Sequence, residues 1–196
     1  MITPRTTSPA GLNLAYYNTV SNGGINTSIQ GNGALAGADV LNNCVGYSQG
    51  RILEMMEQAT GSPVTTNPVA FLNVDAENWY SVAQANGIAT GSTPELYAVG
   101  VWYSASQNVG HVANIEQYSG GTWYISESHY YYPDTGGSWD YSTLDANLMP
   151  AFLGGDTSWA LIGFIYPLRG ITPTPTPTPM TFRKLPFIYY LKPWYL

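Results

Sequence analysis

Residues 43–60 read NCVGYSQGRILEMMEQAT, and this stretch carries the clearest helix signals in the chain. Asn43 is a typical helix N-cap, and Gly61 with Pro63 beyond it is a typical helix stop. The pattern therefore predicts a helix from Cys44 to Thr60 that carries the only cysteine of the chain in its first turn. The residues that recur at the three- and four-residue spacing of one helical face are Val45, Ser48, Ile52, Met55, Met56 and Ala59.

Composition limits the classes of protein that fit. One cysteine rules out an internal disulfide framework, and one cysteine with two histidines is too few for a closed structural zinc site. No apolar run reaches the ~18 residues of a membrane-spanning helix. The N-terminal residues 1–17 lack a charged region followed by an apolar stretch, so no secretory signal is expected.

Charge is unevenly distributed along the chain. All twelve acidic residues precede residue 157, whereas three of the six basic residues lie in the last fifteen positions. Residues 1–170 therefore carry a formal charge of −9 and the tail carries +3. A body this acidic excludes binding to nucleic acid through its phosphates.

A proline-rich stretch divides the chain. Residues 172–179 read TPTPTPTP, which forms an extended, semi-rigid spacer. The expected organisation is a domain over residues 1–170, a Thr-Pro linker over 171–179 and a short basic and aromatic tail over 180–196.

The order of elements predicts an α+β fold with N-terminal helices packed on an antiparallel sheet. Residues 11–40 are rich in Gly and Asn and are expected to form loops, and a second short helix is expected over Asp75–Asn86. Helices followed by antiparallel strands are typical of the α+β class. The expected strands are Tyr97–Tyr103, His111–Tyr118, Thr122–Tyr131 and Ala160–Leu168.

Cys44 has the surroundings of a nucleophile. The N–H groups and the dipole of a helix start stabilise a thiolate, and a thiolate needs an imidazole partner. The two candidates are His111 and His129, and Glu127 shares a strand face with His129 because residues two apart point the same way. Taken singly, a lone cysteine is more often a small buried hydrophobe, and a lone histidine is more often structural.

Whether His111 lies on the same sheet face as Glu127 and His129 depends on whether the loop between the two strands has an odd or an even number of residues. If residues 119–121 form a three-residue loop, His111 lies opposite His129, and Glu127 is within diagonal reach of His111. If Gly120 and Gly121 form a two-residue turn, His111 lies opposite Tyr130 and points away. A shared catalytic face therefore predicts the three-residue loop.

Three stretches together resemble the CHAP family of cysteine- and histidine-dependent amidohydrolases and peptidases, which cleave peptidoglycan. They are NCVGYSQGRILEM, VGHVANIEQYSGGTWYISESHY and GFIYPL. The resemblance implies a papain-like α+β fold, with Cys44 as nucleophile, His111 as general base and Glu127 as the residue that orients the base. It also implies that backbone N–H groups at the helix start, aided by Asn43, stabilise the oxyanion.

The sequence departs from the family pattern beside the acid. Members often carry Asn two residues after the Glu, and this chain has His129 there. His129 is therefore a candidate fourth member of the site. It could hydrogen-bond as the Asn does, bind substrate or compete as the base. Some members bind calcium through an acidic N-terminal loop, but the matching region here carries only Asp39, so no metal and no cofactor are expected. Candidates for the substrate groove are Tyr47, Trp102, Tyr103 and Tyr130.

The function that the resemblance implies is cleavage of an amide bond in a Gram-positive cell wall, as an amidase or an endopeptidase, by a phage lysin. Such an enzyme would be made in the host cytoplasm and reach the wall after holin release, or be carried on the virion. A secreted bacterial amidase toxin and a non-catalytic wall-binding or virion structural module are the alternatives. The tail over 180–196 could contact wall polymer or a membrane surface.

Overall fold

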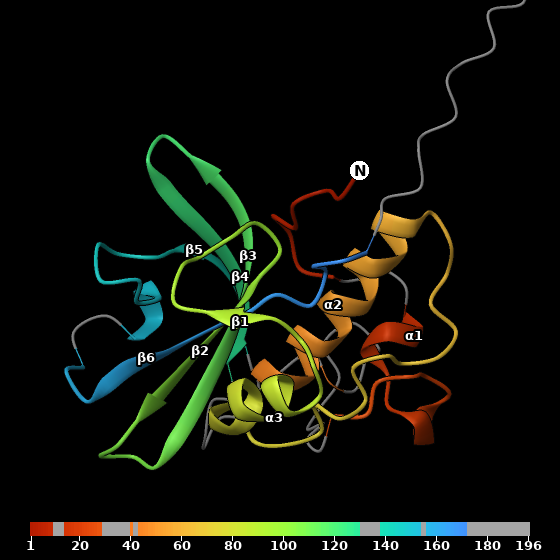
Figure 1. The fold of residues 1–196 in the computed structure, drawn as a ribbon, viewed down its shortest axis with the longest axis horizontal. Helices are drawn as coiled ribbons and strands as arrows, with labels where there is room; N and C mark the ends of the chain where they lie inside the picture. Colours follow the sequence, from red (N-terminus) through yellow and green to blue (C-terminus); the bar gives the residue numbers. More distant parts are fainter. Residues whose placement is uncertain (10–13, 29–39, 41–42, 130–137, 154–155, 172–196) are drawn as a thin grey trace, which may run out of the picture.

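The computed structural model describes residues 1–9, 14–28, 40, 43–129, 138–153 and 156–171. A six-stranded antiparallel sheet lies beside one long helix, so the chain has the predicted α+β fold of the papain-like kind (Figure 1). Residues 172–179 of the predicted linker, the tail, Tyr130 and Asp39 lie outside the described residues.

Helix α2 spans Cys44–Thr60, as the sequence predicts. The Asn43 side-chain oxygen accepts hydrogen bonds from the N–H groups of Val45 (2.9 Å) and Gly46 (3.3 Å), which caps the first turn. The helix ends at Gly61, whose φ of 71° is the left-handed conformation that glycine adopts without strain. Both predicted helix signals are confirmed.

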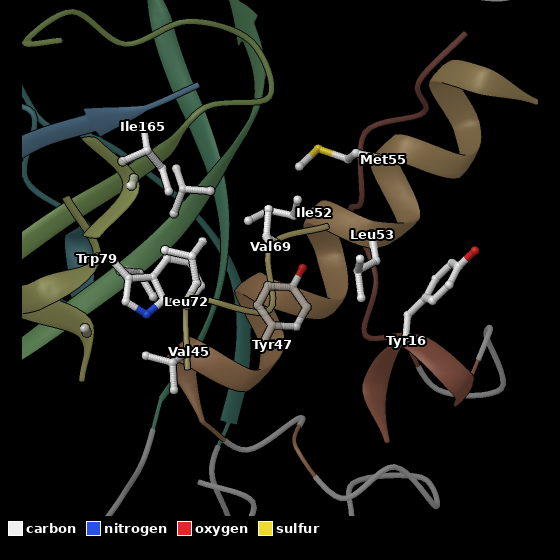
Figure 2. Close-up of a cluster of buried hydrophobic side chains, with 14 of the residues drawn as sticks. Tyr16, Val45, Tyr47, Ile52, Leu53, Met55, Val69, Leu72, Trp79 and Ile165 are labelled. Atoms are coloured by element: carbon white, nitrogen blue, oxygen red, sulfur yellow. The ribbon is translucent and has the colours of Figure 1, made fainter. Parts of the chain in front are cut away.

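α2 is buried on nearly every side, although the sequence pattern predicts only one apolar face. Helix α1 (Leu14–Tyr17) packs against it at Gly50, where a Cβ atom would lie 2.5 Å from a ring carbon of Tyr17. The missing side chain therefore lets the two helices approach closely. Figure 2 shows the resulting core, in which Val45 and Ile52 of α2 belong to the same buried cluster as Trp79 and Ile165.

The sheet has the strand order β1-β6-β2-β3-β4-β5, and all neighbouring strands are antiparallel. The sequence did not predict the two edge strands, β1 and β5. Alternate residues of the central strands enter two separate buried clusters, as Val112 and Ala113 do. The strands are β1 (Thr90–Gly91), β2 (Val99–Ser104), β3 (Val109–Ser119), β4 (Thr122–His129), β5 (Ser138–Thr143) and β6 (Trp159–Ile165).

The second predicted helix is present as two short pieces. The 3-10 turn η2 (Ala76–Asn78) leads into helix α3 (Trp79–Ala85), and the chain turns at Gly87. Two further 3-10 turns are η1 (Val20–Asn22) and η3 (Ala151–Leu153). Within the described part of the chain, no helix is long and apolar enough to cross a membrane.

The predicted three-residue loop between β3 and β4 is wrong. Ser119 pairs with Thr122, so Gly120 and Gly121 form a two-residue turn, with φ values of 59° and 84°. The odd residue lies in the strand instead, because Ile115 pairs with Ile125 while Gln117 pairs with Tyr124. This bulge at Glu116 keeps Asn114 opposite Ser126, which is the register that the loop was expected to provide.

Four buried charges lie between α2 and β3. Arg51 donates two hydrogen bonds to Glu116, from Nε at 2.8 Å and from Nη2 at 2.7 Å, and its Nη1 lies 2.9 Å from Glu54. Arg5 forms the second ion pair with Glu54, and its backbone N–H donates to Glu116 at 3.0 Å. The positive and negative charges balance, which is the condition for burying them.

Candidate active site

Cys44 lies at the N-terminal end of α2 and is half-buried. The Asn43 side-chain oxygen is used as an acceptor for the N–H groups of Val45 and Gly46, so the cap fixes the first turn on which the thiol stands. Cys44 lines a surface cavity of about 680 Å³. Its sulfur is therefore fixed in place on the helix and also accessible from that cavity.

His111 lies between Cys44 and Glu127. Its Nε2 atom is 2.7 Å from Glu127 Oε2, and the interaction of its ring with the Cys44 thiol is the largest contribution that raises its pKa. Because Nε2 faces the carboxylate, Nδ1 is the nitrogen left for the thiol. The structure thus brings together the three residues that the sequence predicts for catalysis, in the order thiol, imidazole, carboxylate.

The glycine before His111 has a packing role. A Cβ atom on Gly110 would lie 2.2 Å from the backbone nitrogen of Glu77 and 2.6 Å from its carboxylate. Only glycine therefore lets η2 pack against the start of β3. This contact forms one wall of the cavity, which Asp75, Ala76 and Glu77 line.

Glu127 is fully buried and held from two sides. Ser142 of β5 donates its hydroxyl to Glu127 Oε1 at 2.8 Å, so the carboxylate presents Oε2 to His111. The sequence could not predict Ser142, because β5 itself was not predicted.

The pKa values of this pair move in opposite directions. Burial lowers the pKa of His111, but its hydrogen bonds to Cys44 and Glu127 and the charges of both residues outweigh burial and raise that pKa to about 10. Burial raises the pKa of Glu127, but the hydrogen bond from His111 and the charges of His111 and His129 outweigh it and lower that pKa to about 2. At neutral pH the pair is therefore imidazolium and carboxylate.

His129 lies beside this pair. Its ring centroid is 5.8 Å from that of His111, and its Nε2 is 3.6 Å from Glu127 Oε2, too far for a good hydrogen bond. That buried nitrogen has no hydrogen-bond partner among the residues that the structure describes. The Phe152 ring stacks on the His129 ring, with centroids 3.8 Å apart. The sequence around Phe152 gives no sign of this contact.

The cavity walls differ from the predicted groove. Tyr47 and Trp102 are fully buried, and Tyr103 lies outside the lining and hydrogen-bonds Asn108. Phe152 and Trp159 supply aromatic surface instead. Both come from the C-terminal part of the described chain, and sequence spacing does not link them to Cys44.

One group of side chains has the composition of a metal site. The ligand atoms of His111, Glu127 and His129 all lie within 4.8 Å of one another, and all three residues are buried. The sequence predicts no metal, because it does not reveal that these three side chains lie together.

The fold and the thiol–imidazole–carboxylate arrangement define a papain-like protein. Residues 35–129 match the model of the CHAP domain family. The matched range includes the predicted catalytic residues and ends at His129. The resemblance inferred from the three sequence stretches is therefore confirmed.

Two solved structures are similar over part of their length. An N-acetylmuramoyl-L-alanine amidase from Staphylococcus aureus shares 26% identity, with 54% of this chain and 28% of that chain covered and a TM-score of 0.37. A protein named Ly7917, solved with the hydrolyzing product of MDP, shares 17% identity, with 82% and 61% covered and a TM-score of 0.38. This chain covers less than two thirds of either. A comparison with curated proteins found no match.

Proposed function

We propose that this chain is a cysteine-dependent peptidoglycan hydrolase that cleaves an amide bond of the bacterial cell wall. The observation that carries the proposal is the position of His111, which hydrogen-bonds Glu127, interacts with Cys44 and lines the same open cavity as Cys44. The CHAP domain match supports the wall as substrate. We further propose a phage lysin acting on Gram-positive walls as the biological setting.

The geometry supports an acyl-transfer mechanism. The Cys44 thiolate attacks the amide carbonyl carbon, and the backbone N–H of Cys44 at the start of α2 stabilises the oxyanion. His111 gives its proton to the leaving amine as the C–N bond breaks, which leaves a thioester on Cys44. His111 then takes a proton from the attacking water, the C–S bond breaks, and the wall fragment leaves as a carboxylic acid.

Asn43 contributes to this scheme chiefly by holding the backbone of the first helical turn in place. Its side-chain oxygen is an acceptor that caps Val45 and Gly46, so that oxygen does not stabilise an oxyanion. The backbone N–H of Cys44 is our candidate donor, and the Asn43 amide nitrogen stays a prediction from the family resemblance.

The charges of the cavity bear on the substrate. Asp75 and Glu77 line the cavity, and neither Lys nor Arg is among its lining residues in the part of the chain that the structure describes. Neutral or cationic parts of a wall peptide are therefore better tolerated beside Cys44 than anionic parts.

The function is tested by labelling Cys44 and assaying purified Gram-positive walls. Because the chain has one sulfhydryl, iodoacetamide can modify only this site, and one label per chain should abolish release of new amino groups. New N-termini of alanine alone would indicate an amidase, and other N-termini an endopeptidase. Full activity of completely labelled protein would contradict the proposed chemistry.

A further inference from the structure

The two imidazoles and the carboxylate of the active site form a set of metal ligands that the acyl-transfer mechanism does not require. His111 Nε2 is 2.7 Å and His129 Nε2 is 3.6 Å from the same oxygen, Glu127 Oε2. Two imidazoles and one carboxylate are a common ligand set for zinc with one open coordination position. The mechanism uses only one of the two imidazoles.

The distances fit a small ion after a modest adjustment. Zinc bonds of about 2.1 Å in tetrahedral geometry place ligand atoms roughly 3.4 Å apart. The separation between His129 Nε2 and Glu127 Oε2, 3.6 Å, is close to this value, and that between His111 Nε2 and Glu127 Oε2, 2.7 Å, must widen by less than about 1 Å. Both histidines line the cavity beside Cys44, so an ion can enter from there and keep a water as its fourth ligand.

The surroundings resemble the second layer of groups that usually orients metal ligands. Ser142 donates its hydroxyl to Glu127 Oε1 at 2.8 Å, which leaves Oε2 as the oxygen that faces the two imidazoles. Phe152 stacks on the His129 ring at 3.8 Å and restricts its rotation.

A second observation independently points to a ligand. His129 Nε2 is buried, its side chain is only 8% exposed, and it has no hydrogen-bond partner among the described residues. An unpartnered buried nitrogen is costly, and coordination would satisfy it.

We propose that His111, Glu127 and His129 bind one zinc ion, and that the bound ion inhibits the enzyme by withdrawing His111 from catalysis. The inhibitory consequence rests on the proposed hydrolase function, whereas the binding itself does not. An ion at this place occupies the nitrogen that faces Glu127 and replaces the hydrogen bond that orients the base.

A competing site is the thiolate itself, because zinc also binds cysteine. The two arrangements differ in a way that can be measured. Binding at the proposed site does not need the sulfur, so Cys44→Ala should keep it. Binding at Cys44 and His111 requires the sulfur and, with Co²⁺ as the probe, gives a sulfur-to-metal absorption band.

The experiment titrates the full chain with Zn²⁺ by calorimetry and with Co²⁺ by visible absorption, after removal of metal with EDTA. We expect one ion per chain in the wild type and affinity within about threefold in Cys44→Ala. Affinity should be lower by at least about 100-fold in His129→Asn, and no sulfur-to-metal band should appear. Circular dichroism of each variant checks that it is folded. Ca²⁺, which prefers oxygen ligands, should not compete.

Three results would overturn the proposal: no saturable binding of Zn²⁺ or Co²⁺ to the wild type, loss of binding in Cys44→Ala, or unchanged affinity in folded His129→Asn. In the wall assay, Zn²⁺ should inhibit the wild type reversibly, and wild-type activity that is unchanged when the site is saturated would overturn the inhibitory part. A wild type that binds metal as expected but clears no wall would contradict the proposed function and leave the metal site standing.

Discussion

Arg51 of α2 and Glu116 of β3 form a buried ion pair, with Arg51 Nη2 2.7 Å from Glu116 Oε2 and both side chains fully shielded from solvent. Glu116 is also the extra residue of the β-bulge, and it accepts a hydrogen bond from Ser126, the neighbour of Glu127, at 2.6 Å. The pair therefore joins the helix that carries Cys44 to the strands that carry His111 and Glu127.

Removing both partners of this pair should lower the free energy of unfolding by less than the sum of the two single losses. Arg51→Met or Glu116→Leu leaves a buried charge unpaired, and each should lower the free energy of unfolding by about 3–5 kcal/mol. The double variant should lose clearly less than the sum of the two, because no opposite charge of this pair is left unpaired. Urea unfolding of the wild type and the three variants measures the coupling, and strictly additive losses would contradict the buried pair.

Gly50 should not accept a side chain. Ala in a helix is favoured over Gly by about 1 kcal/mol, but its Cβ at position 50 would lie 2.5 Å from the Tyr17 ring and 2.7 Å from the backbone oxygen of Tyr16. Because overpacking costs about 1–3 kcal/mol, we expect Gly50→Ala to lower the melting temperature. Ser81→Ala at an exposed position of α3 is the control. A rise in melting temperature for Gly50→Ala would show that α1 does not pack there.

Gly110→Ala should act on the cavity wall more than on the core. The added Cβ would meet the Glu77 backbone at 2.2 Å, so η2 must move away from the start of β3. Small displacements beside reacting groups are costly, and we expect wall clearing to fall about tenfold or more while circular dichroism stays native. Gly121→Ala in the distant hairpin turn, where a Cβ has open space but φ is 84°, is a control for the effect of strain alone. Equal clearing by both variants would argue against a role for this contact.

Glu127→Gln should lower the pKa of His111. The substitution removes a negative charge and replaces a charged acceptor by a weaker, neutral one, and the charge and the hydrogen bond of Glu127 both help to hold this pKa at about 10. The pKa of His111 is raised above its ordinary value of 6.5 in the folded protein. Its contribution to the free energy of unfolding is therefore complete below pH 6.5 and is lost as the pH rises towards 10. The decline in unfolding free energy over this range should be smaller in the variant.

The measurement is a proton NMR titration of metal-free protein, which is simple because the chain has two histidines. In the wild type, His111 should stay charged through neutral pH, and in Glu127→Gln it should titrate at lower pH. Identical titration of His111 in the two proteins would contradict the charge pairing.

Local signals in the sequence predicted some parts of this molecule well. The Asn43 cap and the Gly61 stop gave α2 its observed ends, because capping depends on neighbouring residues only. Helix and strand periodicity made Cys44, Glu127 and both histidines candidates, and the family resemblance singled out His111 as the base. The structure places His111 beside both Cys44 and Glu127.

Other parts depend on contacts between distant residues, which local patterns do not contain. Residue counting along the two strands predicts the correct face for His111 but puts the odd residue in the loop, because the sequence gives no sign that β3 is irregular. The bulge is instead stabilised by Arg51, which is 65 positions away in the sequence. Likewise, Phe152 and Trp159 reach the cavity through the chain beyond β5, and their spacing from Cys44 carries no information about it.

The most direct test of the central claim compares purified Gram-positive wall clearing by the wild type and by Cys44→Ala, with Ser81→Ala as the control and with folding verified for each. The account predicts that Cys44→Ala loses at least about 1,000-fold in rate while the control clears walls normally. Clearing by folded Cys44→Ala at the wild-type rate would contradict the claim that Cys44 is the nucleophile.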